Sequence, residues 1–132
     1  MAAQASPSTS DRIALIDMIR AGLTVKMVDD AAGALGLSFK DLADYGVIAP
    51  RTLTHSRKSG KFSPTQSNRV ARFFRVFRWA LDTFGSTEKA KTWLNRPTRA
   101  LGGQQPADLL DTEEGARLVE DLLFRIDHGM AT

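Results

Sequence analysis

The sequence predicts an all-α fold, in which a bundle of short helices is followed by a smaller helical domain at the C-terminus. Apolar residues recur at helical spacing along most of the chain, and no long stretch alternates with a period of two. Glycine and proline residues divide this pattern into separate helices. With 132 residues, of which 42% are hydrophobic, the chain can bury the core of one compact domain or of two small helical ones.

Two helices are expected before residue 36. Ser10 is a suitable N-cap for a helix over 11–20, and the small, polar residues 1–10 are interpreted as a flexible tail. Along one side of this helix lie Ile13, Ile16 and Ile19. A second helix is expected over 25–35, and its predicted buried positions are Met27, Val28, Ala31 and Leu35.

Three further helices are expected up to residue 84. Ser38 can cap a short helix that reaches Tyr45, and proline is well placed at the first position of a helix over 50–58. The clearest start signal is Ser63-Pro64-Thr65-Gln66, which combines a capping box with proline at the first helical position. The helix that begins there should reach Phe84.

The long helix over 64–84 has one apolar and one basic side. At about 100° per residue, seven apolar side chains fall within about 120° of one another. They are Val70, Phe73, Phe74, Phe77, Ala80, Leu81 and Phe84. The opposite side carries Arg69, Arg72, Arg75 and Arg78.

The C-terminal part is expected to contain two helices separated by turns. Ser86 can cap a short helix that carries Ala90, Trp93 and Leu94, and the glycines and prolines of 95–106 predict an irregular segment. Thr112 can cap the last helix, whose first turn holds two glutamates set against its positive end. The inner stripe of that helix is predicted to be Leu118, Val119, Leu122, Leu123 and Ile126.

Charge is distributed unevenly along the chain. No acidic residue occurs between Asp44 and Asp82, whereas the same stretch contains eight lysines and arginines. From Asp82 to the end, nine acidic residues stand against six basic ones. A basic middle and an acidic end indicate two different partners. Together with the break near Gly85, this predicts two domains, over 11–85 and 86–132.

Several classes of function are not expected. The N-terminus lacks the basic and apolar segments of a secretory signal, and the longest apolar run is far too short to span a membrane. The absence of cysteine fits a cytoplasmic protein. His55 and His128 are far apart and have no ligand-like spacing around them, so no metal site is expected. Neither a nucleophile elbow nor a phosphate loop is present, which argues against an enzyme and against a cofactor.

Residues 41–53 fit a helix-turn-helix unit. Such a unit needs a small residue in its first helix and an apolar residue ten positions later, and Ala43 and Leu53 meet this requirement. The glycine of the turn, Gly46, stands one position before its usual place. A rival frame over 32–42 has the same spacing, and a helical hairpin without any DNA contact is a third interpretation.

The basic character of the helix over 50–58 favours the first frame. The second helix of the rival frame would bring aspartates toward DNA phosphates, which is unfavourable. Arginine and threonine on the outer face of the helix over 50–58 suit base contacts, and cations beyond it suit phosphates. The predicted DNA-binding residues are Arg51, Thr52, Thr54, His55, Arg57, Lys58, Lys61 and Arg69.

Residues 86–129 are too few to form a strong core alone, so they must pack on the long helix or on a partner. Tryptophan, arginine and apolar side chains beside glycine and proline turns are typical anchors of protein interfaces. Alternatively, Trp93, Leu94 and Leu101 close the core of this chain. The residue types alone leave both interpretations open.

Three motifs in this part follow one another in a specific order. They are Trp93-Leu94 before Pro97, Leu101-Gly102-Gly103 before Pro106, and Leu109-Leu110 before Thr112 and Gly115. In this order they resemble the toxin-binding domain of the Xre/MbcA/ParS antitoxins. The segment from about Leu23 to Phe84, with Pro50-Arg51-Thr52-Leu53 and the stretch from Phe62 to Arg69, resembles the Xre-like helix-turn-helix half of the same family.

The resemblance covers about 23–129 and has small departures. Phe62 stands where the family commonly has leucine. An Arg-Arg pair that often follows Thr-Leu is replaced by Thr54-His55-Ser56-Arg57, so the DNA sequence that relatives bind cannot be transferred to this chain. The implied fold is an N-terminal helix-turn-helix bundle with a small C-terminal helical toxin-binding domain.

The resemblance implies the antitoxin of a bacterial type II toxin–antitoxin pair. Its partner would be a RES-domain toxin that consumes NAD or uses it for ADP-ribosylation, and the antitoxin would cover the toxin's active site. It would also repress its own promoter, as a homodimer or within a larger toxin–antitoxin assembly. The alternative is a helix-turn-helix transcriptional regulator without a toxin partner. The predicted toxin contacts are Trp93, Asn95, Arg96, Pro97, Arg99, Leu101, Gly102, Gly103, His128 and Met130.

Overall fold

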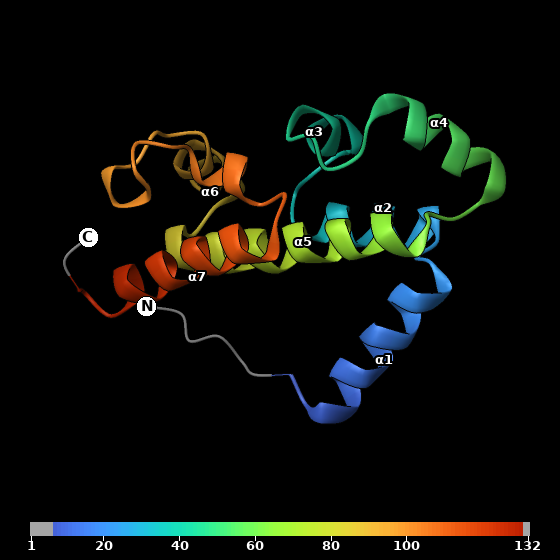
Figure 1. Ribbon diagram of the computed structural model, residues 1–132, viewed down its shortest axis with the longest axis horizontal. Coiled ribbons are helices and arrows are strands. Elements are labelled where there is room, and N and C mark those ends of the chain that lie inside the picture. Colours follow the sequence, from blue (N-terminus) through green and yellow to red (C-terminus); the bar gives the residue numbers. More distant parts are fainter. Residues whose placement is uncertain (1–6, 131–132) are drawn as a thin grey trace. The chain divides into compact units, whose positions relative to one another are not determined.

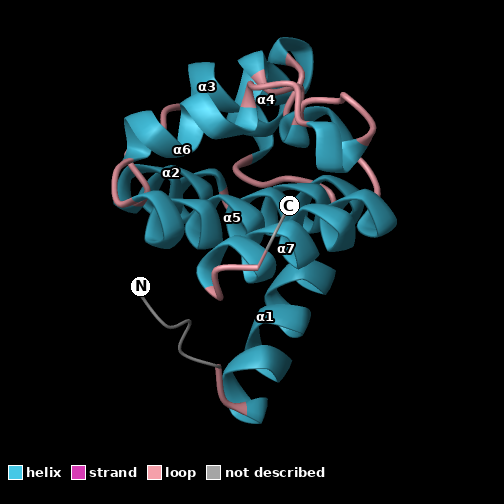
Figure 2. Ribbon diagram, turned by 90° about the vertical axis from the view of Figure 1, so that its left-hand side faces the viewer, coloured by secondary structure: helices cyan, strands magenta, loops and turns pink. Residues whose placement is uncertain are grey.

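The computed structural model describes residues 7–130, and this part of the chain consists of helices and connecting loops (Figures 1 and 2). Between residues 7 and 130 there are seven α-helices, two short 3-10 helices and no strand, which confirms the all-α prediction. The α-helices are α1 (Thr9–Ala21), α2 (Val25–Ala34), α3 (Phe39–Asp44), α4 (Pro50–Ser59), α5 (Pro64–Phe84), α6 (Thr87–Leu94) and α7 (Glu113–Asp127). The 3-10 helices are η1 (Arg99–Leu101) and η2 (Pro106–Leu109).

The chain forms two compact units, and the division between them falls within α5. The N-terminal unit comprises the described residues 7–71, and the C-terminal unit comprises residues 72–130. Each unit has buried apolar residues of its own. Helix α5 therefore contributes its first part to one core and its second part to the other.

Helix α1 begins two residues earlier than predicted. Its N-cap is Ser8 rather than Ser10, because the Ser8 hydroxyl accepts the N–H of Asp11 at 3.0 Å. Residues 1–6 of the predicted flexible tail lie outside the described residues. No residue of α1 is buried, and Ile13 is 53% exposed.

Helix α2 buries a face shifted from the predicted one. Val28 and Leu35 are buried as expected, but Met27 and Ala31 are exposed and Ala32 is buried in their place. The start of the helix explains the position of Met27. Its sulfur accepts the N–H of the capping residue Thr24 at 3.4 Å, so the side chain turns back toward the helix end rather than into the core.

Two connections of the N-terminal unit lie side by side and close its core. The N–H of Phe62 donates to the carbonyl of Leu23 at 2.9 Å, and the N–H of Val25 donates to the carbonyl of Gly60 at 3.0 Å. The buried hydroxyl of Ser67, on α5, accepts the N–H of Leu23 at 2.8 Å. These bonds satisfy backbone groups that would otherwise be buried without partners. They hold the α1–α2 connection against the start of α5.

In the C-terminal unit, α7 runs parallel to the second part of α5. Residues that come later on α5 contact residues that come later in the chain: Arg75 bonds Glu113 and Glu120, and Trp79 bonds Asp127. A parallel pair needs a long connection, which α6, η1 and η2 provide, and Figure 1 shows α7 beside α5. The predicted inner stripe of α7 is correct for its buried members Val119, Leu122 and Leu123. Leu118, by contrast, is 48% exposed, and Ile126 is only half-buried.

Candidate functional site

Helices α3 and α4 are joined by the tight turn expected within 41–53. Gly46 adopts φ +73°, a left-handed conformation that favours glycine, and the N–H of Val47 donates to the carbonyl of Leu42 at 2.9 Å. Val47 and Ile48 are buried beneath the turn. Because the left-handed residue is the first one after the capping position of α3, the glycine belongs at 46 and not at 47.

One side of α4 presents a continuous stripe of exposed polar and basic residues. This α4 stripe consists of Arg51, Thr54, His55 and Lys58, spaced by three or four positions. On the other side of the helix, Ser56 is buried and Thr52 is half-buried. The hydroxyl of Thr54 donates to the carbonyl of Pro50 at 3.1 Å, which leaves its oxygen available as an acceptor. Four of the eight predicted DNA-binding residues thus lie together on one accessible face.

The remaining three cations among the predicted DNA-binding residues lie outside the α4 stripe. The guanidinium of Arg57 lies 5.5 Å from the ring centroid of Phe39, so a cation–π contact joins α4 to α3. Lys61 donates through Nζ to the carbonyl of Ala21 at 3.4 Å. Arg69 is exposed on α5. These contacts leave Arg57 and Lys61 charged, and charge alone is sufficient for a phosphate contact.

The rival recognition helix, α3, is less suited to DNA. Its Lys40 forms an exposed ion pair with Asp44 at 3.0 Å, so a carboxylate lies beside the cation. Asp41 accepts the N–H of Ser38 at 2.9 Å as part of the helix cap. A short helix with this charge pattern offers phosphates little attraction, which favours α4 as the recognition helix.

Two arginines from the long basic run have a different role from the one expected. Arg72 donates to the carbonyls of Leu110 and Asp111 at 3.0 and 2.9 Å. Arg75 bonds Glu120 and Glu113 at 3.0 and 3.1 Å. Burial lowers the pKa of Arg75, but the hydrogen bond and charge of Glu120, aided by Glu113, outweigh this effect and raise the pKa above its ordinary value. Both arginines therefore stabilise the C-terminal unit, and their guanidinium groups are bonded there, whereas phosphate contacts were expected of them.

The ten residues of the C-terminal unit that were predicted to contact the toxin fall into a buried group and an exposed group. Trp93 and Leu101 are buried, which places them in the core of this unit. The other eight residues are exposed: Asn95, Arg96, Pro97, Arg99, Gly102, Gly103, His128 and Met130.

The exposed loop around η1 is closed by its own backbone. The N–H of Thr98 donates to the carbonyl of Gln104 at 3.1 Å, and the N–H of Gly103 donates to the carbonyl of Thr98 at 2.9 Å. Gly102 and Gly103 both have positive φ, of +68° and +83°. The loop holds Arg99 on its exposed surface.

The end of α7 contains an exposed aromatic pair, Phe124 and His128, of which only His128 was predicted from the sequence as a contact. The rings of Phe124 and His128 stack with centroids 4.0 Å apart, and His128 Nδ1 lies 2.8 Å from the carbonyl oxygen of Phe124. Phe124 is 45% exposed. It was not predicted as a contact. Its place beside the buried stripe, one position after Leu123, is the signal that could have identified it.

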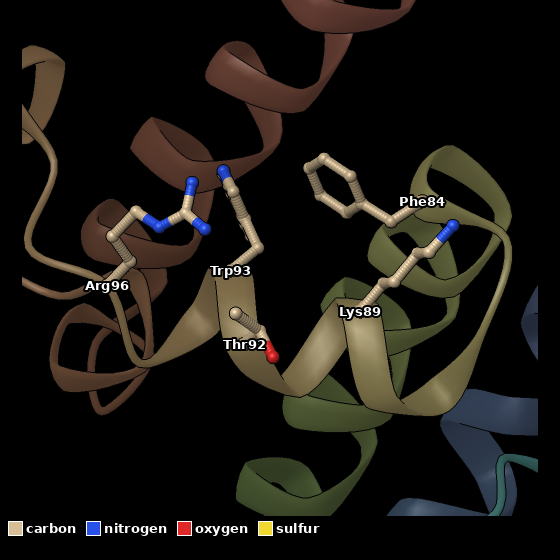
Figure 3. A pocket seen from close by; sticks show the side chains of 5 residues that line it. All are labelled: Phe84, Lys89, Thr92, Trp93 and Arg96. Carbon is tan, nitrogen blue, oxygen red and sulfur yellow. The ribbon is translucent and has the colours of Figure 1, made fainter.

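A pocket of about 230 Å³ opens between the end of α5 and α6, both in the C-terminal unit. Its lining consists of Phe84, Lys89, Thr92, Trp93 and Arg96 (Figure 3). The rings of Phe84 and Trp93 have centroids 5.2 Å apart and are tilted by 35°. Of these five residues, Trp93 and Arg96 were predicted from the sequence as contacts.

Residues 7–130 contain neither a cluster of metal ligands nor a membrane-spanning helix. No group of three or more histidine and acidic side chains in this range could hold a metal ion. Over the same range, no helix combines the length and the apolar character needed to cross a membrane.

Comparisons with known proteins match both units of the chain. Residues 14–75 match the family model described as the antitoxin Xre-like helix-turn-helix domain. Residues 80–129 match the model described as the antitoxin Xre/MbcA/ParS C-terminal toxin-binding domain. The predicted presence of a helix-turn-helix domain and the predicted family resemblance are thereby confirmed.

Individual relatives are also named as antitoxins. An Antitoxin Xre from Yersinia enterocolitica is 38% identical over 118 residues, which cover 88% of this chain and 80% of that protein. An Antitoxin Xre from Photorhabdus laumondii is 38% identical over 119 residues, which cover 87% of this chain and 79% of that protein. A Prs ADP-ribosylating antitoxin from a Sphingobium species is 46% identical over 48 residues, 36% of this chain and 30% of that protein.

Proposed function

Because this chain belongs to the Xre family of antitoxins, which act in toxin–antitoxin systems, we propose that it neutralises a RES-domain toxin and represses its own promoter. The C-terminal unit would cover the active site of the toxin, and the N-terminal unit would bind DNA. The chain acts by binding alone, with no catalysis and no cofactor of its own. Promoter binding also implies that it works in the cytoplasm.

Two observations support the toxin-binding role. The C-terminal unit matches a domain described as toxin-binding, and eight predicted contacts are exposed on it. The name of the Sphingobium relative contains the word ADP-ribosylating, which supports a partner that uses NAD as a donor of ADP-ribose. Covering the active site of such a toxin would exclude NAD.

The toxin-binding role is tested by adding the purified chain to its RES-domain partner and measuring NAD consumption. We expect inhibition that is complete at a stoichiometric ratio. The variant Lys58→Ala, altered in the other unit, should inhibit equally well and serves as the control. Undiminished NAD consumption would contradict the proposal. If promoter binding persisted in that case, the chain would be a helix-turn-helix regulator without a toxin partner.

The promoter-binding role depends chiefly on the α4 stripe. An exposed helix face with Arg51, His55 and Lys58 can enter the major groove, where arginine recognises guanine through two hydrogen bonds. Lys61 and Arg69 would add phosphate contacts. We expect Arg51→Ala to weaken binding to the upstream DNA about 10-fold or more in a gel-shift titration, since one such contact is worth about 1–3 kcal/mol.

Lys26 provides a matched control for this titration. It is an exposed lysine of the same unit, but it lies on α2 and is paired with Asp30 at 3.1 Å. The variant Lys26→Ala should retain the affinity of the unaltered chain. Equal affinities for Arg51→Ala and Lys26→Ala would exclude α4 as the recognition helix.

A homodimer, or a larger toxin–antitoxin assembly built on one, is part of the same proposal. The exposed apolar side chains of α1 support it, because a helix without buried residues gains stability by pairing with a second copy. These side chains are Ile13, Leu15, Ile16 and Met18. In sedimentation velocity, Ile16→Asp should shift the chain to a monomer, whereas Leu118→Asp, also at an exposed apolar position, should not. A dimer that survives Ile16→Asp would rule out α1 as the interface.

A further inference from the structure

The pocket between α5 and α6 combines an aromatic floor with a cationic rim. Phe84 and Trp93 form the floor, and Trp93 is only 8% exposed, so its ring is held in place by the core. In Figure 3, Arg96 lies on one side of the aromatic pair and Lys89 on the other. Thr92 completes the lining from the last turn of α6.

The two rim cations are available for a partner. Lys89 and Arg96 are exposed, and within residues 7–130 neither side chain forms a hydrogen bond or an ion pair. They belong to a segment, 89–107, that contains four lysines and arginines and no acidic residue. This segment interrupts a region that is otherwise rich in acidic residues. The pocket therefore carries a local positive charge that attracts anionic groups.

The size of the pocket limits what can occupy it. Cavities that bind cofactors and other small molecules usually measure about 300–1,000 Å³. At about 230 Å³ this pocket is smaller, and it suits a single side chain. A rigid aromatic floor beside an arginine is typical of the central anchor pocket of a protein interface.

We propose that the pocket receives one apolar side chain from an acidic segment of the toxin, whose carboxylates pair with Lys89 and Arg96. This inference rests on the proposed toxin-binding function and adds the chemistry of the toxin surface that is recognised. The apolar side chain packs on Phe84 and Trp93, which removes water from the pocket. In the drier environment, the flanking ion pairs contribute more than they would on an open surface.

The test measures the affinity of the full chain for the purified toxin by titration calorimetry. Lys89→Glu and Arg96→Glu should each raise the Kd about 10-fold or more, and Arg96→Lys should retain most of the affinity. Thr92→Trp, which fills the pocket and leaves both cations intact, should also weaken binding. Lys58→Glu makes the same charge change in the N-terminal unit and should leave the Kd unchanged. Circular dichroism melting verifies that each variant is folded.

The outcomes distinguish this inference from the function on which it rests. If the unaltered chain does not bind the toxin, the proposed function fails. If it binds and both glutamate variants bind equally well, the acidic segment is excluded while the function stands. If Thr92→Trp weakens toxin binding and the glutamate variants do not, an acidic segment as the occupant of the pocket is also excluded. The charges can also be exchanged, by combining Arg96→Glu with a toxin in which one acidic residue is changed to lysine. Restored affinity in this combination supports the ion pair between Arg96 and the toxin directly.

Discussion

Two glycines inside helices, Gly115 and Gly33, differ in the space around their Cα atoms. At Gly115, on α7, an added Cβ would collide with the backbone carbonyl of Leu109. At Gly33, on α2, no atom other than those of adjacent residues and of the local helix backbone lies within 4 Å of an added Cβ. Alanine is favoured over glycine inside a helix by about 1 kcal/mol, so the surroundings decide the sign of each substitution.

We expect Gly115→Ala to lower the free energy of unfolding by about 1–3 kcal/mol, because a backbone carbonyl cannot move aside as a flexible side chain could. Gly33→Ala should raise the same quantity by up to about 1 kcal/mol. Urea denaturation followed by circular dichroism measures both. Equal effects of the two substitutions would contradict the role assigned to the contact between Gly115 and Leu109.

Helices α5 and α7 are joined at their C-terminal ends by one carboxylate. Asp127 accepts the indole N–H of Trp79 and the hydroxyl of Thr83, both at 2.7 Å, and all three side chains are half-buried. Together with the bonds of Arg75 to Glu120 and Glu113, this contact fixes the register of the parallel pair along its length.

Replacing Asp127 with alanine leaves the N–H of Trp79 without its partner in a partly dry environment. We expect a loss of about 1–3 kcal/mol in the free energy of unfolding, measured by chemical denaturation. Asp121→Ala removes an exposed carboxylate from the same helix and should change stability by no more than about 0.5 kcal/mol. A similar loss for both variants would mean that the carboxylate of Asp127 acts through the overall charge of the helix and not through its two bonds.

At the scale of the whole molecule, local signals predicted the helices better than the contacts between them. Caps and breaks depend on neighbouring residues, so the capping box of Ser63 and Gln66 was predicted correctly, with both bonds at 3.1 Å. Helical periodicity predicts that one face is buried, but it locates the centre of that face only to within about one residue. For this reason Met27 and Leu118 were assigned to the core although they are exposed.

The candidate sites were predictable to different extents for the same reason. The α4 stripe is contained in a single helix, so the spacing of its residues and their basic character were enough to predict it. The pocket brings Phe84 of α5 together with Lys89 of α6 and with Arg96, which follows α6. Lys89 was not predicted as a contact residue. Likewise, an uninterrupted run of basic residues gave no indication that Arg75 would pair with Glu120, 45 positions away.

The basic run therefore contains cations of two kinds, and the full chain can be used to separate them. Arg51 and Lys58 are exposed on the α4 stripe, whereas Arg72 and Arg75 are bonded within the C-terminal unit. Each phosphate contact changes the slope of log K against log salt concentration by about 0.9. We expect Lys58→Ala combined with Lys61→Ala to make the slope shallower by about two, with little change in thermal stability.

Arg72→Ala combined with Arg75→Ala should have the opposite effects. The salt slope should stay the same at a temperature where the variant is folded. The melting temperature should fall, because Glu113 and Glu120 each lose their bond to Arg75 and the carbonyls of Leu110 and Asp111 lose a donor. The two pairs carry equal charge, so a simple effect of net charge would change the slope equally in both variants. That result would return Arg72 and Arg75 to the DNA surface and refute the division drawn from their contacts.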